Sequence, residues 1–143
     1  MKTNYSWTKK FFSNLYNIYS NGAILGNLKD KSFSQTAQGE VNGKEYIFKT
    51  KGFLKQHTQI IDSSENRIIG EITYNSWMTK ATIAINDKIL NWKYDNAWNT
   101  KWSLFDTAGT LMNFSGSSSK GHINSNVEDE LLILTGLFVT NYY

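Results

Sequence analysis

The sequence contains no cysteine and no proline among its 143 residues, and its only histidines are His57 and His122. Without cysteine the chain has no disulfide, no thiolate nucleophile and no sulfur ligands for a metal. With only two histidines as well, we expect no transition-metal site, and we expect no cofactor. The absence of proline excludes proline-rich linkers, so the chain must turn on Gly, Asn, Asp and Ser.

Long hydrophobic runs are also missing. No apolar stretch reaches the ~20 residues that a transmembrane helix needs. The N-terminus lacks the apolar core of a secretory signal, because Lys9 and Lys10 interrupt it. We therefore expect a cytoplasmic protein.

Charge is distributed unevenly along the chain. Residues 1–60 hold nine Lys and three acidic residues, whereas residues 61–143 hold six basic and nine acidic residues. A basic half can attract anionic lipid or nucleic acid over a long range. Lysine dominates over arginine, which disfavours specific base readout, and we expect nucleic acid not to be the partner.

What the sequence has in excess is aromatic residues, with five Trp, eight Tyr and eight Phe. Aromatic residues are enriched in strands, and a repeat with a spacing near 44 predicts how the strands are arranged. Residues 18–28, 61–72 and 104–114 each read as a strand, a polar turn and a second strand. A glycine follows the aliphatic pair at Gly26 and Gly70, and Asn113 takes its place in the third copy; such glycines mark a bulge or a close backbone approach.

The correspondence continues at an offset of 44, where residues 41–49 match residues 85–93. Asn42-Gly43 and Asn86-Asp87 sit where two-residue hairpin turns would form. Phe48 and Trp92 alternate with more polar neighbours, which predicts one buried strand face. The repeat unit is thus a four-stranded meander, and in the degraded third copy we expect a turn and a short edge strand around Ile123.

The C-terminus breaks this pattern. Ser125 and Glu128 have the spacing of a capping box, and acidic residues 128–130 would favour the N-terminal end of a helix dipole. Residues 131–143 carry no side-chain charge and are apolar around the whole circumference, which is typical of a buried helix. A helix over about 126–141 is too short to span a bilayer but, at roughly 21 Å, matches the bore of a small barrel.

A repeated meander followed by an apolar C-terminal helix resembles the tubby C-terminal-like superfamily, which includes the LURP-one-related proteins and the phospholipid scramblases. The resemblance is carried by "IIDSSENRIIGEI", "WSLFDTAGTLMNF" and "DELLILTGLFVTNYY", and it covers residues ~15–143. It implies a closed antiparallel β-barrel of about twelve strands with a buried hydrophobic C-terminal helix. Scramblase-type cysteine-rich and calcium-binding stretches are missing, and no binding residue of the superfamily can be placed here.

The expected organisation is therefore one mainly β domain over residues 1–143. Its meander repeats would cover about 15–57, 58–101 and 102–124, with the helix following them.

Three lysines form the densest basic run, namely Lys49, Lys51 and Lys55, and His57 follows them. Alternation places Lys49 and Lys51 on the face opposite Phe48, where they could contact phosphate or anionic lipid, with Phe53 and Leu54 as an apolar tip. The alternative interpretation of this run is an ordinary solvated outer face.

A second cluster, made of Trp92, Trp98 and Trp102 with Tyr94, could stack nucleic-acid bases. We favour its interpretation as barrel core that packs against the helix.

Catalysis has little support from the motifs. The chain lacks a G-x-S-x-G elbow, and Gly22 and Gly26 lie in a hairpin rather than in a phosphate-binding loop. We expect a non-enzymatic binding or scaffolding domain that contacts anionic lipid or phosphoinositide at a membrane surface. If the helix packed outside the barrel, a lipocalin-like carrier of an apolar ligand would be the better prediction. A structural or oligomeric interaction protein is the third alternative.

Overall fold

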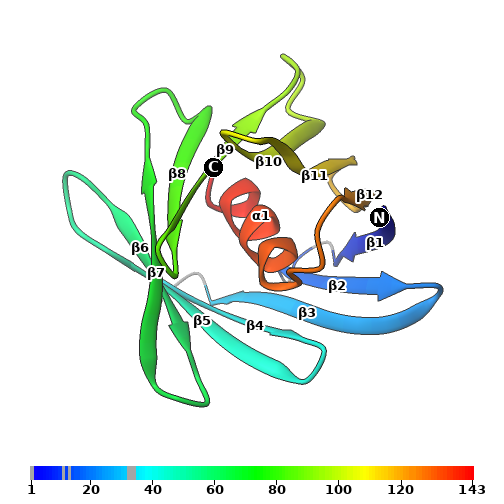
Figure 1. Ribbon diagram of the computed structural model, residues 1–143, viewed down its shortest axis with the longest axis horizontal. Coiled ribbons are helices and arrows are strands. Elements are labelled where there is room, and N and C mark those ends of the chain that lie inside the picture. The colour runs from blue at the N-terminus through cyan, green and yellow to red at the C-terminus, as the bar shows by residue number, and fades with distance from the viewer. Residues whose placement is uncertain (1, 11, 13, 32–34) are drawn as a thin grey trace.

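A computed structural model describes residues 2–10, 12, 14–31 and 35–143. Twelve strands and one helix follow one another along the chain, with bounds β1 (Thr3–Lys9), β2 (Leu15–Ser20), β3 (Ala23–Lys31), β4 (Thr36–Val41), β5 (Lys44–Lys51), β6 (His57–Asp62), β7 (Arg67–Tyr74), β8 (Lys80–Ile85), β9 (Lys88–Tyr94), β10 (Lys101–Asp106), β11 (Gly109–Gly116), β12 (Lys120–Ser125) and α1 (Leu131–Tyr142). Each strand pairs antiparallel with its neighbours in sequence, and β1 pairs with β12 to close the ring. The prediction of a closed antiparallel barrel is confirmed (Figure 1).

Strand pairing repeats three times around the barrel. Phe48 of β5 lies opposite Ala37 and Ile60, and Trp92 of β9 lies opposite Ala81 and Leu104. The third set of this kind is formed by β1, since its Trp7 lies opposite Gly121 and Ile18. The N-terminal strand, which the repeat pattern missed, therefore completes the meander that begins at β10. The expectation of an edge strand around Ile123 is wrong, because β12 has β11 on one side and β1 on the other.

A bulge occurs at the same place in the first hairpin of each meander, at Ile18/Tyr19, Ile60/Ile61 and Leu104/Phe105. Gly26 and Gly70 lie beside the first two bulges. A Cβ on Gly26 would lie 2.0 Å from the carbonyl oxygen of Glu40, so the close backbone approach predicted there is confirmed.

The third copy differs from the prediction at this point. The residue opposite Leu104 is Met112, not Asn113. Leu104 and Met112 are as far apart in sequence as Ile18 and Gly26 of the first hairpin, so Thr110-Leu111 is the equivalent of Ile24-Leu25. Matching the aliphatic pair Leu111-Met112 instead put the correspondence out by one.

The predicted hairpin turns form where expected. Asn42 and Gly43 have φ of 54° and 82°, and Asn86 and Asp87 have φ of 47° and 68°. Positive φ at both central residues defines the turn type whose twist matches that of the strands.

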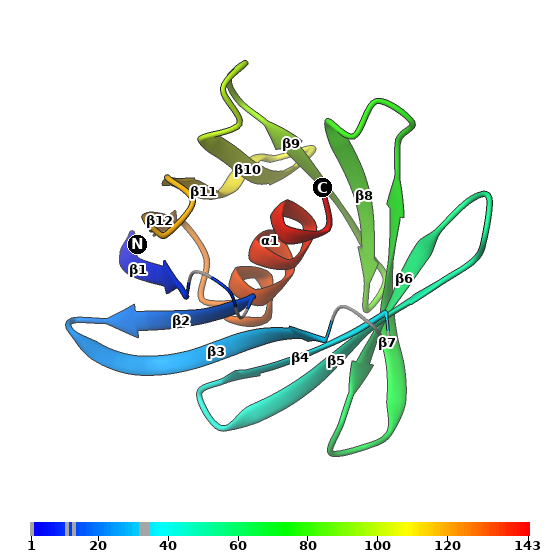
Figure 2. The ribbon, with the colours of Figure 1, turned by 180° about the vertical axis from the view of Figure 1, so that it is seen from behind.

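The helix lies inside the ring of strands (Figures 1 and 2). Its first nine residues, Leu131 to Val139, are all buried. The Phe138 ring stacks on Phe48 of β5 with centroids 4.7 Å apart, and the Trp92 indole N–H donates to the Gly136 carbonyl at 3.2 Å. The predicted buried C-terminal helix is confirmed, and helix side chains together with strand side chains form the core.

The start of the helix differs from the prediction. It begins at Leu131, five residues later than expected, and Glu130 precedes it without a side-chain cap. Ser125 is still in β12, where its hydroxyl accepts from Val127 N–H at 3.1 Å and donates to the Val127 carbonyl at 2.6 Å. This local turn uses the hydroxyl that a capping box would need. The acidic residues 128–130 consequently lie before the first helical turn rather than in it.

Candidate binding surface

The barrel has two unlike ends. Because adjacent strands are antiparallel, alternate connections lie at the same end. One end, the loop rim, carries the loops β1–β2, β3–β4, β5–β6, β7–β8, β9–β10 and β11–β12. The other, the turn rim, carries the five remaining connections between strands and residues 126–130 before the helix.

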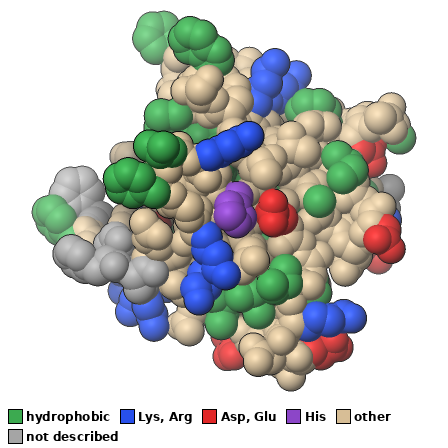
Figure 3. Space-filling model, turned by 90° about the vertical axis from the view of Figure 1, so that its left-hand side faces the viewer, with side chains coloured by type: hydrophobic (Ala, Val, Ile, Leu, Met, Phe, Trp, Pro, Cys, Tyr) green, Lys and Arg blue, Asp and Glu red, His purple; other side chains and the backbone are tan. Residues whose placement is uncertain are grey.

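The two ends differ in charge. All 27 charged residues lie in the part of the chain that the structure describes. Dividing each strand at its midpoint assigns three acidic residues and eleven lysines to the loop-rim half, a formal charge of +8; the lysines are Lys9, Lys10, Lys29, Lys31, Lys49, Lys51, Lys55, Lys80, Lys93, Lys101 and Lys120. The turn-rim half holds nine acidic and four basic residues, a formal charge of −5. Figure 3 shows this separation on one side of the barrel, with most Lys and Arg side chains toward the left and top and most acidic side chains toward the right and bottom.

Exposed apolar side chains are concentrated at the same end of the barrel as the lysines. Of nine large hydrophobic residues exposed among those described, six lie in loops of the loop rim: Phe12, Phe53, Leu54, Trp77, Met78 and Trp98. The other three, Ile24, Ile68 and Ile89, lie on strands near the turn rim. The loop rim is thus both basic and apolar at its tips.

The three predicted lysines belong to this rim. Lys49 and Lys51 are exposed on β5, and the intervening Thr50 and the preceding Phe48 are buried, as alternation predicted. Lys55 is exposed in the β5–β6 loop. His57 of β6 lies directly opposite Lys51 in the strand register.

The β5–β6 loop needs a glycine to project its apolar tip. Gly52 has φ of +97°, and a Cβ there would lie 2.5 Å from the Lys55 carbonyl oxygen. The tight turn leaves Phe53 and Leu54 each 94% exposed. Three basic and two apolar side chains therefore share one short segment of the rim.

Two further loops carry a motif that sequence reasoning missed. Residues 75–80 read Asn-Ser-Trp-Met-Thr-Lys and residues 96–101 read Asn-Ala-Trp-Asn-Thr-Lys. They are the β7–β8 and β9–β10 loops, joined to the adjacent strands β8 and β9. The recurrence of Asn-x-Trp-x-Thr-Lys was available in the sequence, but its spacing of 21 differs from the 44-residue period.

The two loops share the same three side-chain hydrogen bonds. In the first, the Asn75 side-chain oxygen accepts from the backbone N–H of Thr79 at 3.0 Å and of Lys80 at 3.1 Å, and its amide donates to the Thr79 hydroxyl. In the second, Asn96 makes the equivalent three bonds to Thr100 and Lys101.

The exposure of the tryptophans is also the same in both loops. The residue after each tryptophan has φ of 57°, and Trp77 and Trp98 are 83% and 84% exposed. The prediction that Trp98 packs with Trp92 and Trp102 in the barrel core is therefore wrong for Trp98 alone. The other two are buried, and their indoles cannot stack on bases.

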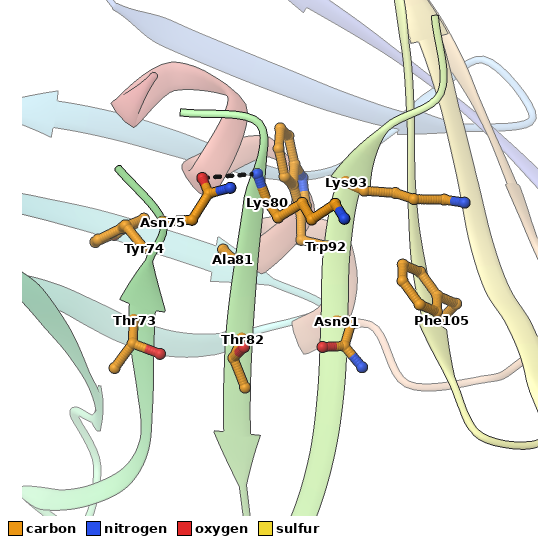
Figure 4. Close-up of a pocket in the computed structure, with 10 residues that line it drawn as sticks. All are labelled: Thr73, Tyr74, Asn75, Lys80, Ala81, Thr82, Asn91, Trp92, Lys93 and Phe105. Carbon is orange, nitrogen blue, oxygen red and sulfur yellow. Dashed lines mark hydrogen bonds between the residues drawn. The ribbon is translucent and has the colours of Figure 1, made fainter. Parts of the chain in front are cut away.

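A hollow of about 520 Å³ lies on the outer face beside the first of these loops (Figure 4). Lys80 and Lys93 lie opposite each other in the register of β8 and β9 and flank it. Its floor includes the polar row Thr73, Thr82 and Asn91. Lys93 also lies 5.1 Å from the centre of the Phe105 ring and 3.8 Å from an Asp95 carboxylate oxygen. In Figure 4 the Lys93 side chain extends toward Phe105. The lining thus combines two lysines with hydroxyl and amide side chains, which are residue types suited to binding an anion.

The end of the helix closes the barrel at the loop rim. The Tyr142 hydroxyl donates to the Gln56 side chain, and the Tyr143 hydroxyl donates to the Lys80 carbonyl. The Asn141 amide donates to Asp30 at 2.5 Å. Burial raises the pKa of the Asp30 carboxyl, and the Asn141 hydrogen bond and the charge of Lys9 oppose that rise. These polar contacts narrow the mouth, and a hollow of about 180 Å³ remains there, lined by Asp30, Gln56, Phe138, Asn141 and Tyr142 among others.

The described residues include no group of three His, Cys, Asp or Glu side chains placed to hold a metal ion. Nor does that part of the chain contain a helix with the length and apolar character needed to cross a membrane.

Fold and surface together define a closed twelve-stranded barrel around a helix, with a basic rim tipped by apolar side chains. The chain matches no protein-family model, no curated protein and no solved structure.

Proposed function

We propose that this chain is a non-enzymatic binding module of the tubby C-terminal-like type that docks on an anionic lipid surface through its loop rim. The observation that carries the proposal is the separation of formal charge, +8 at the loop rim against −5 at the turn rim. A molecule with this polarity approaches an anionic membrane basic end first, because its acidic end is repelled.

The magnitude is sufficient for reversible docking. Each lysine near an anionic membrane surface contributes about 1 kcal/mol, and the attraction falls off within a Debye length of about 8 Å at physiological salt. Four of the eleven rim lysines in contact would therefore supply about 4 kcal/mol. The segment with Lys49, Lys51 and Lys55 provides three charges on one side of the rim.

A phosphorylated lipid headgroup, such as that of a phosphoinositide, would fit the hollow between Lys80 and Lys93. The hollow opens on the same half of the barrel as the rim lysines. Ammonium groups bind phosphate as point charges, and the Thr82 hydroxyl and Asn91 amide can add hydrogen bonds.

Two alternatives have less support from the geometry. A carrier of an apolar ligand needs an open bore, whereas Leu134 and Phe138 of the helix are buried inside this barrel. A structural protein that self-associates through the loop rim would have to overcome repulsion between two rims of charge +8.

Vesicle co-sedimentation tests the proposal. The protein should sediment with phosphatidylserine-containing vesicles, and more strongly when a phosphoinositide is added, but not with neutral phosphatidylcholine vesicles. Binding should weaken as salt rises.

A matched pair of triple variants tests whether vesicle binding depends on the position of the lysines or on the net charge of the protein. Lys49→Glu/Lys51→Glu/Lys55→Glu alters the loop rim, and Lys2→Glu/Lys44→Glu/Lys88→Glu makes the same charge change at the turn rim. We expect the first to lose at least tenfold in vesicle affinity and the second to stay within about threefold, since about 1 kcal/mol per lysine is at stake. Equal losses, or equal binding to neutral vesicles, would contradict the proposal.

A further inference from the structure

We propose that the two Asn-x-Trp-x-Thr-Lys loops are paired membrane anchors. Their tryptophans, with the neighbouring Phe53-Leu54 tip, insert into the boundary between lipid headgroups and acyl chains. The barrel then stands on the membrane with its loop rim down. This inference rests on the proposed function and adds insertion to electrostatic attraction.

The first argument is the exposure of the tryptophans. Trp77 and Trp98 are 83% and 84% exposed, whereas Trp7, Trp92 and Trp102 are buried in the core. A large aromatic side chain that contributes so little to the core has no role in packing the fold. Exposed apolar groups gathered at one end of a molecule mark a surface that is covered by something else.

The second argument is that hydrogen bonds within each loop fix a turn in which the tryptophan side chain is exposed. A side-chain amide ties each loop to its own Thr and Lys, at Asn75 and at Asn96, by the same three hydrogen bonds. Met78 and Asn99, which follow the tryptophans, adopt the left-handed region at φ of 57°. That conformation is unfavourable for Met in particular, and it persists here because the Asn bonds fix the turn. The same construction in two neighbouring loops presents two indoles at one rim.

The third argument is the match of chemistry to a lipid interface. Indole rings favour the headgroup level, where one edge is apolar and the N–H stays hydrated. A lysine ends each motif, at Lys80 and Lys101, so that each apolar tip has a cation beside it for an anionic headgroup. Leu54 and Met78 have no ring on which a base could stack, so the aliphatic part of the surface favours lipid over single-stranded nucleic acid.

Tryptophan fluorescence tests insertion directly. On phosphatidylserine-containing vesicles the emission of the intact protein should shift to the blue, and lipids brominated near the headgroup end of the acyl chain should quench it. The Trp77→Phe/Trp98→Phe variant should keep its affinity within about threefold while losing the quenching, because only buried tryptophans remain. The Trp77→Ser/Trp98→Ser variant should lose at least tenfold in vesicle affinity.

Controls separate this inference from the proposed function. Ile68→Ser/Ile89→Ser removes two exposed apolar side chains near the turn rim and should leave affinity unchanged. If the intact protein sediments with anionic vesicles but shows no quenching, insertion is refuted and electrostatic docking stands. If it does not sediment at all, both fail. Insertion is also refuted if the serine variant binds vesicles normally, if oligothymidine quenches the emission in place of lipid, or if these side chains are protected in a self-associated form.

Discussion

Truncating Phe138 to alanine tests whether the helix is an integral part of the barrel core. The side chain is 4% exposed and its ring is stacked on Phe48, itself fully buried, with centroids 4.7 Å apart and planes 13° apart. Removing a buried phenylalanine costs about 3–5 kcal/mol, as lost transfer energy plus the cavity that remains. The stacked pair itself should account for about 0.5–1.5 kcal/mol of this.

Urea unfolding of four proteins would measure both quantities. The set is the parent chain, Phe48→Ala, Phe138→Ala and the double variant, and the double-mutant cycle isolates the coupling between the two rings. Phe53→Ala, which removes a 94% exposed ring, is the control and should change stability by no more than about 0.5 kcal/mol. A loss below about 1 kcal/mol for Phe138→Ala, or strict additivity in the cycle, would refute the packing described here.

Two other predictions concern residues buried inside the barrel. Gly136→Ala should lower the urea midpoint by the equivalent of about 1–3 kcal/mol, because its Cβ would lie 2.2 Å from the Phe114 ring; an unchanged midpoint would mean that the helix can shift. Burial raises the pKa of Tyr16 and Tyr74 above the ordinary value of 10.0 and that of Tyr143 to about 12, so the fold favours the neutral phenols. The contribution of these phenols to stability should be fully present below pH 10 and should be lost as pH rises toward 12 and beyond. In a pH titration, the absorbance of tyrosinate and the circular dichroism signal should therefore change together. Tyrosines that ionise near pH 10 without loss of structure would contradict this prediction.

Much of the barrel could be predicted because its signals are local. A period of two at Phe48 and Trp92 places one face inward, and Asn42-Gly43 specifies a turn, without knowledge of the partner strand. The N-terminal strand was missed for the opposite reason. Thr3–Lys9 belongs to the third meander only by pairing with β12, more than a hundred residues away. The helix start was misplaced because the Ser125 hydroxyl can bond a nearby backbone group in a turn as readily as it can cap a helix. Here Ser125 is held in β12 by pairing with β1, and its hydroxyl forms the turn.

The residues of the candidate surface are close together in the fold but scattered along the sequence. In a meander, each strand crosses from one rim to the other, so residues that share a rim occur in short segments separated by residues of the opposite rim. Counting formal charge over residues 1–60 and 61–143 gives +6 and −3, because each part of the sequence contains residues of both rims. Sorting the same residues by rim gives +8 and −5, and gathers Phe53, Trp77 and Trp98 at the basic end. The helix occupies the bore, so the docking proposed above assigns recognition to the rim where cations and apolar tips coincide.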